Sequence, residues 1–179
     1  SRRLCAMLSG STYYILGDRV RSLKEKDIED QLRASLDAEY DVILASSADV
    51  WLLLPEWARA KMLEKARAGT GLVFFQRGKE PEALAPYLPM EFTGYDHFAG
   101  RWVPDTNAPP IVAALPYAAL PNVYWCNGSR MKPGTAVASD GLPAVLIAAS
   151  RPGLTGPVLA AGHIEKGRLV QSCLGTPLG

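Results

Sequence analysis

The sequence YDVILASSADVWLLLPEWARAKMLEKARAGTGLVFFQRG, residues Tyr40–Gly78, decides the fold of this chain. Val42–Ala45 is a short, partly β-branched apolar run typical of a buried strand, and Leu72–Phe75 is a second such run. Between them, Pro55 predicts the start of a helix and Gly69 predicts its end. A strand that returns to the same sheet through a helix runs parallel to the first, with a right-handed crossover. The stretch therefore predicts a βαβ unit.

The predicted helix, Pro55–Ala68, carries a narrow apolar stripe. Ala58, Met62 and Ala66 recur at a spacing of four, which places them on one face of the helix. We therefore expect Met62 to be buried against the sheet. The charged residues lie largely off this stripe and predict a solvated face rather than a binding patch: Arg59, Lys61, Glu64, Lys65 and Arg67.

Composition excludes several classes of protein. The net charge is +1 and there is no basic run, so a nucleic-acid-binding surface is not expected. Apolar stretches are only strand-sized and no signal peptide opens the sequence, so we expect no membrane span and take the cytoplasm as the default compartment. Three cysteines are too few for a disulfide framework or a zinc site, and Cys5 and Cys173 are expected to be buried thiols.

A length of 179 residues suits one domain with a sizeable core. The chain begins Ser-Arg-Arg and ends a few residues after a predicted strand. We therefore expect residues 1–179 to be a single domain from a longer polypeptide. The rest of that polypeptide is the expected partner, and a small molecule or a carbohydrate is the expected ligand.

The residues before the βαβ unit add a strand and a helix. Leu4–Leu8 predicts a first strand, whereas Tyr13–Leu16 fits either a strand or a helix start. Asp27 caps a predicted helix whose apolar residues, Ile28, Leu32 and Leu36, recur every four positions. This order predicts an α/β fold, a flavodoxin-like open, mostly parallel sheet with helices on both faces.

The second half of the chain has a different composition, because 13 of the 14 prolines lie from Pro81 onward. We expect Lys79–Pro110 to be a long loop pinned by its aromatic residues, with one helical turn near Glu82–Tyr87. Further strands are predicted at Ile111–Ala114, Val123–Cys126, Ala144–Ala148 and Val158–Ala161. The last of these leads through a short turn into Arg168–Cys173, which predicts an antiparallel C-terminal hairpin.

Together these segments resemble the class I glutamine amidotransferase-like superfamily. YDVILASS at Tyr40–Ser47, GTGLVFF at Gly69–Phe75, and GPVL followed by EKGRLV within Gly156–Val170 are similar to patterns in its divergent, often non-catalytic branches. These branches include domains found beside carbohydrate-active enzymes and bacterial proteins of unknown role. The resemblance covers most of the chain and implies an accessory domain of a larger bacterial protein.

Catalytic members of this superfamily carry a cysteine on a sharp turn after a strand, in the pattern G-x-C-x-G. The matching segment here is FFQRG, Phe74–Gly78, which puts Gln76 at the position of the nucleophile. A carboxamide does not form the acyl intermediate that a thiolate forms. The resemblance therefore implies a domain without glutaminase chemistry, and we expect no catalytic residue, cofactor or metal. We also expect Gln76 to lie at the carboxyl end of a central strand with no cysteine near it.

The family's H-x-E pair, a histidine base oriented by a glutamate, is matched by His163 and Glu165. Lys166 and Gly167 follow at once, which indicates an exposed hairpin turn in which Gly167 takes a positive φ.

Two alternative functions remain open. One is a cysteine-dependent hydrolase or transferase using Cys126, His163 and Glu165, although bulky Tyr124 and Trp125 stand where a nucleophile turn needs small residues. The other is a flavodoxin-like cofactor-binding domain, although the sequence contains neither G-x-G-x-x-G nor a P-loop.

Candidate ligand-binding residues follow from the predicted sheet, because open α/β sheets bind ligands at the carboxyl ends of their strands. Ser46 and Ser47 end the central strand there, and Gln76 and Arg77 end the next strand. Capping of the following segment is the simpler role for the two serines.

Overall fold

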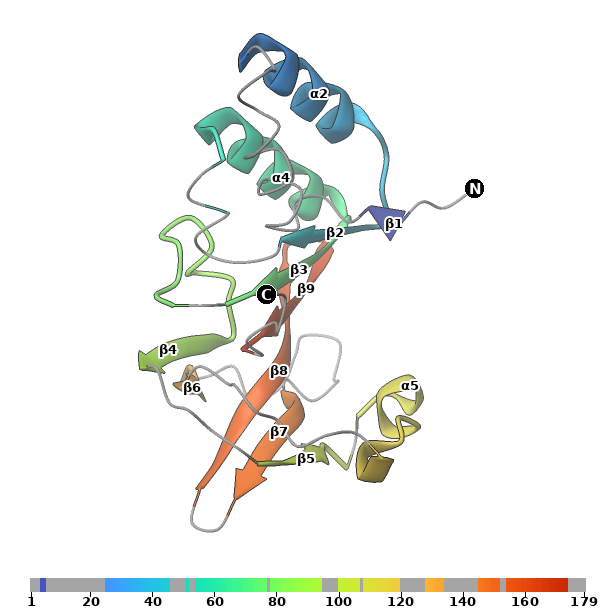
Figure 1. The fold of residues 1–179 in the computed structure, drawn as a ribbon, viewed down its shortest axis with the longest axis vertical. Coiled ribbons are helices and arrows are strands. Elements are labelled where there is room, and N and C mark those ends of the chain that lie inside the picture. Colours follow the sequence, from blue (N-terminus) through green and yellow to red (C-terminus); the bar gives the residue numbers. More distant parts are fainter. Residues whose placement is uncertain are drawn as a thin grey trace.

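The computed structural model describes residues 4–5, 25–45, 51, 54–76, 78–94, 100–106, 108–119, 128–133, 145–151 and 154–173. Seven of its strands form one sheet, in the order β1–β2–β3–β9–β8–β7–β5 (Figure 1). In that order the strands are β1 (Leu4–Cys5), β2 (Val42–Ala45), β3 (Gly71–Phe75), β9 (Gly167–Ser172), β8 (Leu154–Ile164), β7 (Val145–Arg151) and β5 (Arg101–Pro104).

The large sheet has a parallel half and an antiparallel half. The parallel half consists of β1, β2, β3 and β9, each paired in parallel with the next. The antiparallel half follows, because β8 pairs antiparallel with β9, β7 with β8, and β5 with β7. A separate antiparallel pair is formed by β4 (Met90–Gly94) and β6 (Gly128–Met131). This confirms an open α/β fold with an antiparallel C-terminal hairpin.

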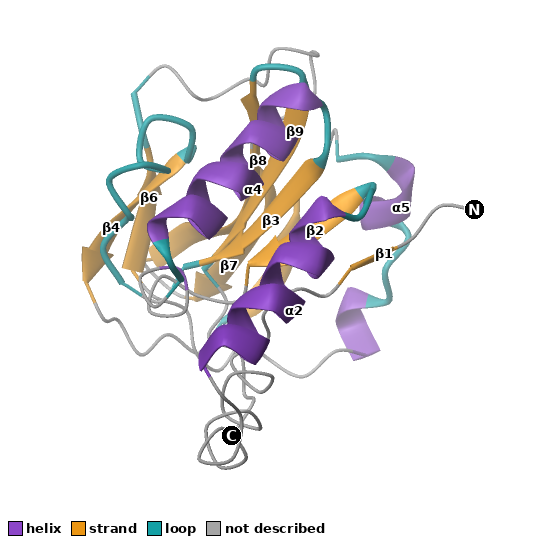
Figure 2. Cartoon of the chain, turned by 90° about the horizontal axis from the view of Figure 1, so that it is seen from above, coloured by secondary structure: helices purple, strands orange, loops and turns teal. Residues whose placement is uncertain are grey.

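The helices are α2 (Glu25–Asp37), α4 (Glu56–Ala68) and the short α5 (Pro110–Ala113), with a 3₁₀ turn η1 (Tyr117–Ala119). Figure 2 shows α2 and α4 side by side over the same face of the sheet. Within the residues described, no helix is both long enough and apolar enough to cross a membrane.

The predicted βαβ unit is confirmed by β2, α4 and β3. The two strands pair in parallel with Val42 opposite Gly71 and Ala45 opposite Phe74. Gly69 ends α4 at φ 128°, a conformation that side chains rarely allow, and donates its N–H to the Ala66 carbonyl.

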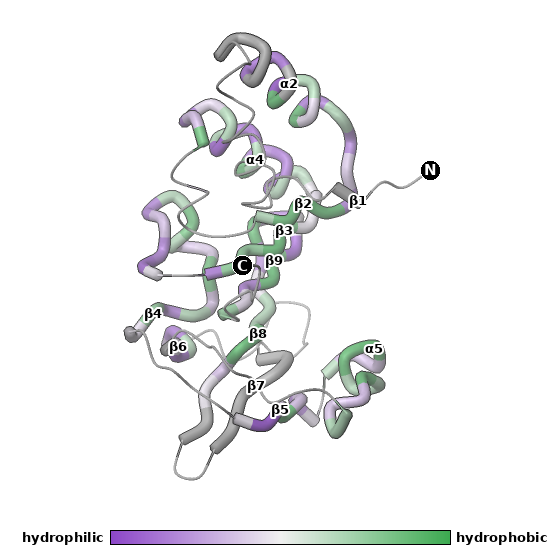
Figure 3. The backbone as a smooth tube through the Cα atoms, in the orientation of Figure 1, coloured by the Kyte–Doolittle hydropathy of each residue, from purple (hydrophilic) through white to green (hydrophobic). Residues whose placement is uncertain are grey.

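The core lies between α2, α4 and this face of the sheet. Met62 is fully buried, together with Ala58 and Ala66 on the same stripe, as the spacing predicted. Leu72 and Phe74 alternate with half-buried residues along β3, and β2 shows the same alternation. Each of these two strands is therefore completely buried on one face and only partly buried on the other. Green, apolar segments accordingly converge where α4 lies against β2 and β3 (Figure 3).

Helix α2 begins two residues before the predicted cap, Asp27. Leu36 is buried and Leu32 is partly buried in the core. The guanidinium carbon of Arg33 lies 4.0 Å from the centroid of the Trp57 ring, and this cation–π contact joins α2 to α4.

The prediction that Lys79–Pro110 is mostly loop is wrong in part, because β4 and β5 lie within it. The expected strand at Ile111–Ala114 is also wrong, since α5 occupies Pro110–Ala113. Adjacent prolines explain this, because proline gives no N–H to a strand ladder and its fixed φ suits the first helical turn.

Other sequence-based expectations have mixed outcomes. Ala144–Ala148 overlaps β7 and Val158–Ala161 lies within β8, which confirms both strands. Tyr13–Leu16 and Val123–Cys126 lie outside the described residues, as does the side chain of Cys5. Strand β6 was not predicted.

Candidate functional site

Of the four predicted ligand-binding residues, the structure describes Gln76, which follows the carboxyl end of β3 and lies beside the end of β9. These strands are parallel neighbours, with Phe75 opposite Ser172. The next residues, Gln76 and Cys173, consequently emerge side by side, and the Gln76 N–H donates to the Ser172 carbonyl at 2.7 Å. Gln76 therefore ends a central strand, as the sequence predicted.

The carboxamide of Gln76 is fully buried and uses all of its hydrogen-bonding capacity within the protein. Its Nε2 donates to the Gly78 carbonyl at 2.9 Å and to Glu80 Oε1 at 3.2 Å. Its Oε1 accepts from Gln171 Nε2 and, at 3.6 Å, from Cys173 Sγ. An amide group has two donor hydrogens and two acceptor lone pairs, so no further bond is left for a ligand.

Gln171 extends this network from β9 to β4. Its Oε1 accepts from the Met90 N–H at 2.8 Å, and its Nε2 donates to the Met90 carbonyl at 3.0 Å. The Gln171 side chain thus pairs with the backbone N–H and carbonyl of Met90 as a residue on a neighbouring strand would. Glu80 adds a second attachment, because its Oε1 also accepts from the Phe92 N–H at 2.5 Å.

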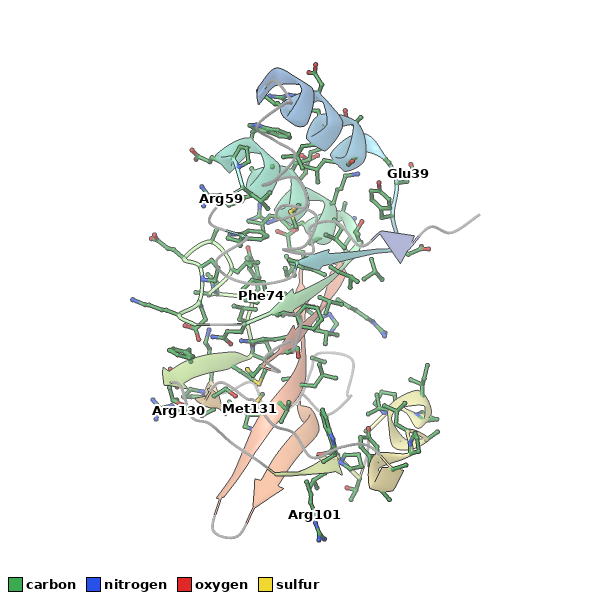
Figure 4. All side chains as sticks on the ribbon, viewed as in Figure 1. Glu39, Arg59, Phe74, Arg101, Arg130 and Met131 are labelled. Atoms are coloured by element: carbon green, nitrogen blue, oxygen red, sulfur yellow. The ribbon has the colours of Figure 1, made fainter. Side chains whose placement is uncertain are left out.

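Apolar packing also helps to hold the β4–β6 pair against the large sheet. Met90, Ala160 and Cys173 form a small buried cluster against which Met131 of β6 packs, and Figure 4 labels Met131 beside the exposed Arg130. In the described part of the chain, every buried side-chain nitrogen and oxygen has a hydrogen-bond partner. The arrangement holds β4 and β6 against the sheet and presents no unsatisfied group to a ligand.

The expectation that no cysteine lies near Gln76 is wrong. Parallel pairing of β3 and β9 brings the Cys173 thiol to the carboxamide, and the thiol is completely buried. Burial of Cys173 itself was predicted and is confirmed.

His163 and Glu165 lie near the amino ends of the parallel strands β3 and β9, whereas Gln76 lies at their carboxyl ends. The β8–β9 hairpin pairs His163 with Arg168 and turns at Glu165 and Lys166, beside the amino end of β3. This turn is separated from Gln76 by the length of β9, roughly 17 Å at about 3.3 Å per residue. The H-x-E pair therefore does not lie at the carboxyl edge where such sheets bind ligands.

The hairpin turn docks on the C-terminal end of α4. The Lys166 N–H donates to the Arg67 carbonyl at 3.3 Å, and the Arg67 Nε lies 3.4 Å from Glu165 Oε1. Arg67 also donates to the Tyr87 hydroxyl at 3.1 Å, and this hydrogen bond is the main cause of a raised Arg67 pKa. Glu165 and Lys166 are exposed, as the sequence predicted.

The predicted positive φ of Gly167 is wrong, since Glu165 takes the left-handed conformation instead, at φ 51°. Glycine is nevertheless required at this position for a different reason. A Cβ on Gly167 would lie 2.8 Å from the Thr70 carbonyl oxygen and still closer to the Ala66 carbonyl oxygen. Close approach of two backbones, rather than turn geometry, excludes a side chain.

Four candidate residues, Ser46, Ser47, Arg77 and Cys126, lie outside the described residues, so their roles stay predictions. The described residues hold no group of three or more His, Cys, Asp or Glu suited to a metal ion. The sequence reasoning missed Gln171 and Glu80. A polar pair, Gln171 and Ser172, inside the predicted strand Arg168–Cys173 was the available signal for Gln171.

Neither a family model nor a curated protein sequence matches this chain. Its fold is shared with solved structures. One is the cytoplasmic protein STM1381 from Salmonella typhimurium LT2, with a TM-score of 0.55 and 18% identity over 78% of this chain. Another is the cytoplasmic protein STM3548 from Salmonella typhimurium, with a TM-score of 0.53 and 16% identity over 88% of this chain.

A third is the cold-adapted β-galactosidase from Rahnella sp. R3, with a TM-score of 0.50 and 13% identity over 77% of this chain. The chain spans 62% of STM1381, 70% of STM3548 and 21% of the β-galactosidase. At these identities the similarity is one of fold.

Proposed function

We propose that this chain is an amidotransferase-like α/β domain without glutaminase chemistry, serving as an accessory or small-ligand-binding part of a larger protein. One observation carries the proposal: Gln76 occupies the strand end where the resemblance places a catalytic cysteine, and its carboxamide is buried and fully hydrogen-bonded. A nucleophile needs an exposed, activated thiolate, whereas this position is closed by a neutral amide.

An accessory role is supported by the occurrence of this fold as 21% of the Rahnella β-galactosidase chain. A fold that recurs as one part of a larger polypeptide is compatible with a supporting role, although fold alone does not determine function. A cytoplasmic location belongs to the same proposal, because STM1381 and STM3548 are cytoplasmic proteins.

The proposed ligand is a small molecule or a carbohydrate bound at the carboxyl edge of the parallel strands. Ser46, Ser47 and Arg77 remain the candidate contacts. Gln76 is not one of these candidate contacts, because its amide already holds β4 to the sheet through Gln171 and Glu80.

Thiol reactivity tests the proposal. Native protein is treated with iodoacetamide, and alkylation of each cysteine is followed by peptide mass spectrometry, with Cys126→Ser as the matched control. We expect Cys173 to be alkylated only after unfolding, because it is completely buried, and Cys126 to react no faster than a free cysteine. Ammonia release from glutamine should not exceed the buffer blank.

Rapid alkylation of Cys126 that is lost in His163→Ala would overturn the proposal in favour of the cysteine-dependent enzyme. Visible absorbance from a bound flavin in the purified protein would instead favour the flavodoxin-like alternative.

A further inference from the structure

No further inference is drawn: the strongest candidate, the buried side-chain cluster of Cys173 and Met90 with Met131 packed against it, where β4 and β6 meet the carboxyl end of β9, rests on a single thiol that already donates to the Gln76 side-chain oxygen, and no second observation among the described residues distinguishes a ligand site there from apolar core packing.

Discussion

The side-chain amide of Gln171 donates to the side-chain oxygen of Gln76, and this bond joins the carboxyl ends of β9 and β3. The same Gln171 side chain takes both backbone hydrogen bonds of Met90. One residue thus connects two parallel strands of the main sheet to the separate β4–β6 pair. Since all these groups are buried, each depends on the others for its hydrogen bonds.

Gln171→Leu should lower the free energy of unfolding by about 2 kcal/mol or more, because each buried polar group left without a partner costs about 1–3 kcal/mol. Urea denaturation measures this loss. Gln76→Leu should behave similarly. The double variant should lose less than the sum of the single losses, with a coupling of about 0.5–3 kcal/mol. Strict additivity of the two losses would contradict the shared network.

Gly167→Ala should destabilise the fold by about 1–3 kcal/mol, because a methyl group there overlaps backbone carbonyls that have little room to move. Lys166→Ala, one residue earlier in the exposed turn, should stay within about 0.5 kcal/mol of wild type. Thermal melts of both variants make the comparison. Equal melting temperatures would mean that the hairpin is not docked on α4.

Met62→Ala should destabilise the protein by about 2–5 kcal/mol, as expected for a fully buried methionine on the core face of α4. Glu64→Ala, on the exposed face of the same helix, should change stability by no more than about 0.5 kcal/mol. Comparing the denaturant melts of the two variants separates the loss of core packing from the change in helix propensity. A loss below about 0.5 kcal/mol for Met62→Ala would show that the helical face is misassigned.

Arg67→Ala should lower the melting temperature only slightly, because its ion pair with Glu165 is exposed and screened by solvent. The difference from wild type should shrink further in high salt. Melts at low and high ionic strength measure both effects. A loss as large as that of Gly167→Ala would mean that the charged contact, and not backbone packing, holds the hairpin.

Much of the fold was predictable because its signals are local. Apolar runs bounded by turn residues located β2, β3 and most of the β8–β9 hairpin, and the spacing of Met62 gave the buried face of α4. Strands β4 and β5 were missed, because Lys79–Pro110 contains several prolines and little of the alternation of apolar and polar residues that marks a strand. Edge strands of this kind form through pairing with distant segments and leave a weak local pattern.

The candidate site was predictable only in part. Gln76 was placed correctly at a strand end, but a ligand-binding role was assigned from its position alone. Its side-chain oxygen instead accepts from Gln171 and Cys173, which lie more than ninety residues away in the sequence. No local pattern encodes such a pairing.

The sequence by itself determined the βαβ unit, the C-terminal hairpin and the absence of a cysteine in the segment that matches the nucleophile turn. These depend on period, turn chemistry and residue identity, which are properties of neighbouring residues. Only the tertiary structure decided that β9 lies beside β3, which puts Gln171 and Cys173 against Gln76 and sets His163 at the far edge. Strand order arises from burial of the whole sheet against its helices, so it depends on contacts between distant segments.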